Sequence, residues 1–159
     1  MATIHLMHGY IGFGKTTTAK RLAKEYGAVR LDGDAFMAKL FGRNPYGEGF
    51  GGYWDLVRYL IWDIAKETIE NGIDVIIDYG FWRRETREKW YKRAKEITPD
   101  VVFHVIQCDM KVARERTLLR TKNNPDMLEI DENCFDIRLK EFEPICESEG
   151  YKIIYHDNN

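Results

Sequence analysis

A glycine-rich segment near the start of the chain restricts its fold more than any other feature. It reads Gly9-Tyr10-Ile11-Gly12-Phe13-Gly14-Lys15-Thr16 and matches the pattern G-x-x-x-x-G-K-[ST] in full. A short apolar run over residues 3–7 precedes it, and helical spacing over residues 15–26 follows it. A glycine loop between a strand and a helix is the context in which this pattern surrounds phosphate with backbone N–H groups. The sequence therefore predicts a nucleotide-phosphate loop.

Each residue type in this loop has its own task. Glycine lets the backbone approach the phosphates closely, and the helix N-terminus adds about half a positive charge. We expect Lys15 to reach the β- and γ-phosphate oxygens and the Thr16 hydroxyl to ligate Mg²⁺. The residues expected to contact the nucleotide are Gly9, Tyr10, Ile11, Gly12, Phe13, Gly14, Lys15, Thr16 and Thr17.

Strand and helix patterns alternate along the rest of the chain. Apolar runs at 3–7, 28–31, 73–78, 101–106 and 152–155 predict strands. Helical spacing covers 15–26, 35–41, 54–71, 83–97, 111–122 and, interrupted by Pro144, 131–148. The alternation predicts an α/β fold with a parallel sheet covered on both faces, in a single domain over residues 1–159. The glycine-rich stretch 42–53 is expected to be a loop that helps to shape an acceptor pocket.

Composition argues against several classes of function without excluding a local basic patch. Lys and Arg number 24 against 26 Asp and Glu, so no global basic field attracts nucleic acid or an anionic membrane. The cysteines at 108, 134 and 146 lie far apart and are expected to be reduced thiols rather than zinc ligands. Neither a signal peptide nor an apolar run of membrane-spanning length is apparent. We expect a cytoplasmic protein.

Other motifs narrow the reaction. The N-K-x-D and D-x-x-G motifs of GTPases are absent from the sequence. Asp78 ends an apolar run but is followed by Tyr79 and Gly80, not by the Glu that activates water in many ATPases. A kinase that transfers phosphate to a small molecule is the remaining class.

Two carboxylates follow predicted strands at the sheet edge that carries the loop. Asp34, in Leu31-Asp32-Gly33-Asp34, is expected to accept the proton of an attacking hydroxyl or to orient it. The alternative is a turn residue that caps the next helix. Asp78 is expected to help to place Mg²⁺ beside Thr16, unless it only ends its strand. Asp32 is a weaker candidate for contact with substrate.

Arginines supply the expected phosphate and substrate contacts. Arg116 and Arg120 lie four residues apart on one predicted helix face, which suits a phosphate clamp or a solvated surface. The basic stretch 83–95 follows Trp82, and Trp82, Arg83 and Arg87 are candidate substrate residues. Such a stretch could also bind the end of a nucleic acid. The simpler interpretation is a solvated helix with its tryptophans in the core.

Taken together, these motifs resemble P-loop kinases of the group that holds zeta-toxin-like, chloramphenicol-phosphotransferase-like and polynucleotide-kinase-like proteins, many known only as AAA domain or ATP-binding proteins. The resemblance rests on residues 9–17, 31–34 and 77–82, and on Cys108-Asp109 followed by Arg116 and Arg120. The 31–34 motif is also similar to gluconate and adenylylsulfate kinases.

The resemblance implies a three-layer P-loop NTPase fold: a five-stranded parallel sheet in order 2-3-1-4-5, helices on both faces, and a small helical lid over 121–149. It implies that Asp34 is the base and that Arg116 and Arg120 contact nucleotide and transferring phosphate. Phe36 and Met37 stand where such kinases often have an Arg, and residues 121–132 contain none.

The sequence therefore predicts an ATP- and Mg²⁺-dependent phosphotransferase that acts on a hydroxyl of a small molecule. The alternatives are a kinase of nucleic-acid 5′-hydroxyl ends and a nucleotide-binding regulatory module without catalysis.

Overall fold

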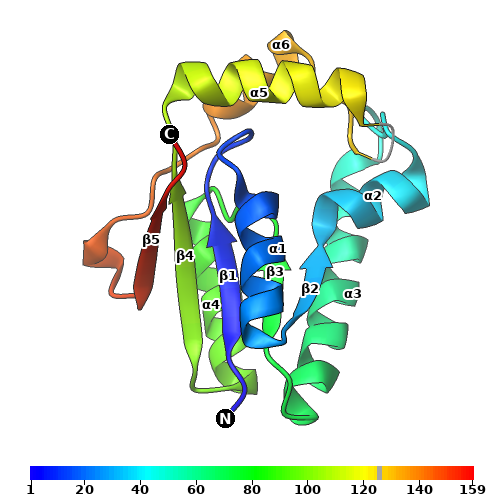
Figure 1. Cartoon of the computed structure of the whole chain (residues 1–159). Coiled ribbons are helices and arrows are strands. Elements are labelled where there is room, and N and C mark those ends of the chain that lie inside the picture. Colours follow the sequence, from blue (N-terminus) through cyan, green and yellow to red (C-terminus); the bar gives the residue numbers. More distant parts are fainter. Residues whose placement is uncertain (125–126) are drawn as a thin grey trace.

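A five-stranded parallel sheet organises the chain in the computed structural model, which describes residues 1–124 and 127–159 (Figure 1). Its strands are β1 (Ile4–His8), β2 (Val29–Asp32), β3 (Val75–Asp78), β4 (Val101–Gln107) and β5 (Ile153–Asp157). Their order is β2-β3-β1-β4-β5, with each neighbouring pair parallel. The predicted strand order is confirmed.

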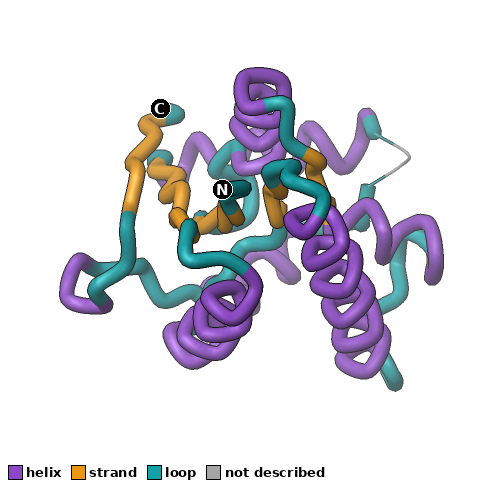
Figure 2. Tube along the Cα trace, turned by 90° about the horizontal axis from the view of Figure 1, so that it is seen from below, coloured by secondary structure: helices purple, strands orange, loops and turns teal. Residues whose placement is uncertain are grey.

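Helices cover both faces of this sheet. They are α1 (Lys15–Tyr26), α2 (Gly33–Phe41), α3 (Phe50–Glu70), α4 (Arg84–Ile97), α5 (Met110–Asn123) and α6 (Glu132–Leu139), with a 3₁₀ turn at Glu147–Glu149. Seen along the strands, α1 lies on one side of the sheet and α3 and α4 on the other (Figure 2). Because side chains alternate along a strand, β1 sends Met7 to a cluster with α1 and Leu6 to a cluster with α3 and α4. The predicted three-layer fold is confirmed.

Two boundaries differ from the sequence prediction by more than two residues. The glycine-rich stretch 42–53 is not a loop throughout, because α3 begins at Phe50 with Gly49 as its N-cap. Phe50 and Trp54 pack against the core, and this burial offsets the low helix propensity of Gly51 and Gly52.

The helical pattern over 131–148 ends early, at Leu139. The following residues are tied to other elements instead: the Glu143 N–H donates to the Trp82 carbonyl at 2.9 Å, and the Ile145 N–H donates to His8 Nε2 at 3.1 Å. These tertiary hydrogen bonds replace helical ones. Pro125 and Asp126, which fall in the predicted lid over 121–149, lie outside the described residues.

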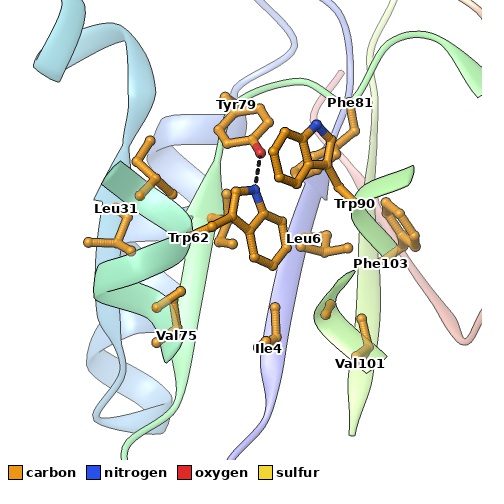
Figure 3. Packing of buried hydrophobic residues seen from close by; sticks show 14 of the residues in the cluster. Ile4, Leu6, Leu31, Trp62, Val75, Tyr79, Phe81, Trp90, Val101 and Phe103 are labelled. Carbon is orange, nitrogen blue, oxygen red and sulfur yellow. Dashed lines mark hydrogen bonds between the residues drawn. The ribbon is translucent and has the colours of Figure 1, made fainter. Parts of the chain in front are cut away.

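The part of the core that lies between the sheet and helices α3 and α4 contains closely packed aromatic rings. Trp62 and Trp90 stack with centroids 5.2 Å apart, and Trp62 Nε1 donates to the Tyr79 hydroxyl at 2.7 Å (Figure 3). This hydrogen bond satisfies two buried polar groups and fixes Tyr79 where β3 ends. None of the helices in the described ranges is sufficiently long and apolar to span a membrane.

Candidate active site

A cavity of about 360 Å³ opens where β1, β2 and β3 end. Its wall is formed by residues that follow these three strands, together with α3, the end of α5 and the segment around α6. Ligands of open parallel sheets bind beyond the carboxyl ends of the strands, so the position is the one the topology favours. Its volume lies within the range of small-molecule sites.

The glycine-rich segment forms the loop between β1 and α1. Gly12 has φ +77°, and a Cβ there would lie 2.2 Å from the Ala113 carbonyl oxygen of α5, so only glycine fits. Lys15 Nζ donates to the Tyr10 carbonyl at 2.8 Å, and Trp82 Nε1 donates to the Gly9 carbonyl at 3.0 Å. These contacts hold the loop from within and from the neighbouring strand end.

Part of the predicted loop lines the cavity. The lining residues are Ile11, Gly12, Gly14, Lys15 and Thr16, whereas Gly9, Tyr10, Phe13 and Thr17 are not among them. Tyr10 is fully buried, and its hydroxyl donates to the Phe135 carbonyl of α6. Burial lowers the pKa of Lys15 to about 8, against the opposing effect of Asp34.

The two carboxylates of the Asp-Gly-Asp turn have different positions. Asp32 is the N-cap of α2, where it accepts from the Ala35 N–H at 3.0 Å. Asp34 lines the cavity and forms no hydrogen bond or ion pair with the described residues. Burial, together with the charge of Asp32, raises the pKa of Asp34 to about 6, although Lys15 opposes the shift.

Asp78 and Thr16 both line the cavity. Asp78 is buried, and its Oδ2 accepts from Arg30 Nη1 at 2.8 Å, while Arg30 also pairs with Asp32 at 2.7 Å. Burial raises the pKa of Asp78 in spite of Arg30. One hydroxyl and one carboxylate, with phosphate oxygens and water as further ligands, fit Mg²⁺. No cluster of three or more metal-ligating side chains exists in the described ranges.

The arginines predicted from the sequence separate into two groups. Arg120 and Arg83 line the cavity, as does Trp82. Arg116 lies outside it, where its Nη1 donates to the Asn158 carbonyl at 2.7 Å.

Arg87, predicted as a substrate residue, does not line the cavity, and its side chain is only 1% exposed. It forms a two-point contact with Glu149 at 2.7 and 2.9 Å and donates to the carbonyls of Phe81, Trp82 and Glu143. All three nitrogens of the guanidinium therefore donate to groups inside the protein. Arg87 holds the loop after β3, which carries Trp82, against the C-terminal part of the chain.

Several cavity residues were not predicted as site residues. They include Trp54, Arg58, Tyr79, Gly80, Phe81, Thr86, Arg138 and Glu141, whereas Tyr46 and Phe50 fall in the stretch 42–53 that is expected to shape the acceptor pocket. A signal was present for Arg58, which lies four residues after Trp54 and so shares its helix face. The segment 121–149 contributes Met127, Leu128, Ile130, Cys134, Arg138 and Glu141 to the wall.

Comparisons place this arrangement among known proteins. The sequence profile of a family described as AAA domain matches residues 4–145. No curated protein sequence matches the chain.

Three solved structures share the fold. A sugar kinase from Janibacter sp. HTCC2649 is 20% identical with a TM-score of 0.69, covering 99% of this chain and 86% of that one. Kti12 from Chaetomium thermophilum, solved with ADP-AlF3, is 14% identical with a TM-score of 0.75, covering 97% and 88%. A chain of the Pnkp1/Rnl/Hen1 RNA repair complex is 18% identical with a TM-score of 0.73, covering 88% and 43%.

Proposed function

The chain belongs to the AAA domain family, and from this membership and the geometry of its cavity we propose that it is a P-loop kinase. It moves the γ-phosphoryl group of ATP, with Mg²⁺, to a hydroxyl of a small molecule. One observation carries the proposal: the Asp34 carboxylate, which has no hydrogen-bond or ion-pair partner among the described residues, shares a cavity with Lys15 of the phosphate loop. A base and a phosphate-binding cation in one enclosed space are the parts that phosphoryl transfer requires.

The roles follow from these positions. The acceptor hydroxyl oxygen forms a bond to the γ-phosphorus while the bond to the β–γ bridging oxygen breaks, and ADP leaves with that electron pair. Asp34 receives the hydroxyl proton, and a pKa of about 6 leaves it ionised at neutral pH. Lys15 and Arg120 hold the phosphate oxygens as charge moves toward the leaving group. Thr16 and Asp78 would hold Mg²⁺, which supplies further positive charge when bound.

Arg116 serves the nucleoside end of ATP in this proposal. It lies beside Asn158, which donates from Nδ2 to the Phe13 carbonyl at 3.0 Å. Neither Arg116 nor Asn158 lines the cavity, so the cavity itself is left for the phosphates and the acceptor. The segment 121–149, which contributes to the cavity wall, acts as the lid that excludes water.

Charge on α4 favours a small acceptor over a nucleic-acid end. Arg87 is buried in its contact with Glu149, Arg83 pairs with Glu141 at 3.5 Å, and Arg93 pairs with Asp63 at 3.6 Å. Three of the seven basic side chains of the stretch 83–95 are thus paired with carboxylates, so less of its positive charge is free for phosphates than its composition suggests.

The test is ADP release from Mg-ATP against a panel of hydroxyl acceptors, with Lys15→Ala as the blank. Sugars, nucleosides, aminoglycosides, hydroxy acids and 5′-hydroxyl oligonucleotides cover the classes considered. Lys15-dependent release with a small acceptor supports the proposal. Release only with oligonucleotides, at a rate that falls steeply with salt, would establish the nucleic-acid kinase instead. Tight ATP binding without turnover for any acceptor would favour a regulatory module.

A further inference from the structure

The cavity wall that α3 and the loop after β3 contribute is built from aromatic rings. Its aromatic lining residues are Tyr46, Phe50, Trp54, Tyr79, Phe81 and Trp82. Tyr79 is fixed in place by the hydrogen bond from Trp62 and by stacking on Phe81, with centroids 4.4 Å apart (Figure 3). Rigid rings of this kind accommodate the flat or cyclic body of a ligand.

One cation lies against these rings. The guanidinium carbon of Arg58 is 5.3 Å from the Trp54 ring centroid and 6.0 Å from that of Tyr79. Its Nη1 contacts Asp55 at 3.3 Å in an exposed pair one helical turn away, and pairs of this type are weak. Nε is buried without a partner, and Nη2 forms no hydrogen bond with the described residues. The ring contacts therefore position a guanidinium whose Nε and Nη2 N–H groups have no hydrogen-bond partner among the described residues.

Trp54 connects this cation to the proposed base. Gly33 precedes Asp34, and a Cβ on Gly33 would lie 2.9 Å from the Trp54 ring. The indole thus packs directly on the turn that carries Asp34, while Arg58 lies over the same indole. Since Trp54, Asp34 and Arg58 line the same cavity, a ligand that packs against the indole lies near both polar groups.

The other cavity cations have other partners or tasks. Arg138 pairs with Glu141 at 3.2 Å, and Arg83 pairs with the same carboxylate at 3.5 Å. Lys15 and Arg120 are placed at the transferred phosphate. Arg58, by contrast, has one charge partner among the described residues, Asp55, and that carboxylate is exposed to solvent.

We propose that the acceptor is a small cyclic hydroxy compound that also carries a carboxylate or a phosphate group. Its ring lies against Trp54 and Tyr79, its anionic group binds the Arg58 guanidinium, and its hydroxyl meets Asp34. A planar guanidinium matches both anions in a two-point contact. The transfer step rests on the proposed function, whereas the binding of the anionic ring does not.

The probes are four compounds that share a hydroxymethyl group. They are 4-(hydroxymethyl)benzoate, 4-(hydroxymethyl)phenyl phosphate, the neutral benzene-1,4-dimethanol and the non-aromatic trans-4-(hydroxymethyl)cyclohexanecarboxylate. Binding is measured by calorimetry without nucleotide on the wild type, on Arg58→Gln and on Arg93→Gln. Arg93 is the matched control, since its Nε is also buried without a partner but it does not line the cavity.

We expect at least one of the three anions to bind the wild type about tenfold more tightly than the neutral diol, since a charge-assisted two-point contact is lost in the diol. Arg58→Gln should remove this preference and Arg93→Gln should retain it. The tighter of the carboxylate and the phosphate identifies the natural anion. Equal affinity for the diol and all three anions, or an anion preference that survives in Arg58→Gln, would overturn the proposal.

The experiments distinguish a failure of the kinase proposal from a failure of the proposed anion site at Arg58. If the anionic ring binds through Arg58 but no acceptor gives Lys15-dependent ADP release, the kinase proposal fails and the anion site stands. If neutral acceptors give Lys15-dependent release while none of the anions binds preferentially, the anion site is wrong and the kinase stands.

Discussion

The carboxylate of Asp32 accepts a hydrogen bond from the backbone N–H of Ala35 at 3.0 Å. This contact makes Asp32 the N-cap of α2 and leaves Asp34, in the first turn of that helix, without a capping task. An Asp-Gly-Asp turn requires one cap, and here the first residue provides it. Asp34 can therefore be unpaired in the cavity at no cost to the helix terminus.

The different tasks of the two carboxylates predict opposite effects of substitution. Asp34→Asn should reduce transfer by at least ~100-fold, the lower range for loss of a general base, with little change in ATP affinity. Asp32→Ala should instead lower the free energy of unfolding by ~0.5–2 kcal/mol, the value of an N-cap. Steady-state kinetics, ATP titration and denaturant unfolding distinguish the catalytic effect of Asp34→Asn from the stability effect of Asp32→Ala. A large loss of ATP binding in Asp34→Asn would refute its role on the acceptor side.

The pH dependence of kcat/KM should have two limbs. Asp34 must be ionised to accept a proton, so the rate should fall below a pKa of about 6, to which burial raises it. Lys15 must be protonated to bind phosphate, so the rate should fall above about 8, to which burial lowers its pKa. In Lys15→Arg the cation does not titrate, so the alkaline limb should disappear while the acidic limb remains. A profile flat from pH 5 to 7 would contradict the assignment of Asp34.

The proposed magnesium site predicts a difference between two conservative changes at Thr16. Thr16→Ser keeps the hydroxyl and should retain activity within a few-fold. Thr16→Val keeps the shape but removes the ligand, so the Mg²⁺ concentration for half-maximal activity should rise by about tenfold or more. The measurement is a Mg²⁺ titration after chelation. Identical titration curves for the two variants would remove Thr16 from the metal site.

The buried contact between Arg87 and Glu149 predicts a stability effect instead of a substrate effect. Arg87→Ala leaves a buried carboxylate unpaired and three carbonyls without their donor, so it should cost about 3–5 kcal/mol of unfolding free energy. Arg84→Ala, at an exposed position three residues earlier, should stay within about 0.5 kcal/mol of the wild type. A loss of acceptor binding at unchanged stability in Arg87→Ala would restore its substrate role.

The sequence predicted the strands, the alternation with helices and the phosphate loop because local patterns determine them, whereas the strand order followed from the resemblance to P-loop kinases. The 15–26 helix is identical in prediction and structure, since the glycine loop sets its start and Gly27 ends it. Arg87 could not be placed, because its partner Glu149 lies 62 residues away and no local pattern pairs them. The acceptor side of the cavity was missed for the same reason: Arg58 and Arg138 approach it from separate helices. The early start of α3 was missed because glycine content indicates a loop unless packing is known.

Buried histidines predict that the protein loses stability as the pH falls. His8 donates from Nδ1 to the Phe81 carbonyl at 3.1 Å and accepts from the Ile145 N–H at Nε2, and the second contact requires the neutral ring because a protonated Nε2 cannot accept. Burial lowers the pKa of His8 to about 4 and that of His104, hydrogen-bonded between His5 and His156, to about 3. Burial also lowers the pKa values of His5 and His156.

Because the unfolded chain binds these protons near the ordinary pKa of 6.5 and the folded chain does not, stability rises with pH through this window. The stabilisation that comes from the neutral histidines is complete above about pH 6.5 and is lost as the pH falls toward 4. For His8 alone the loss in the free energy of unfolding is on the order of 3 kcal/mol. The raised pKa of Asp34 acts in the opposite direction between 3.8 and about 6. The comparison that isolates His8 is His8→Gln, which keeps a donor and an acceptor but does not titrate. Denaturant unfolding at pH 7 and pH 4.5 should show a smaller loss in His8→Gln than in the wild type, and an equal loss would mean that His8 is charged in the folded protein.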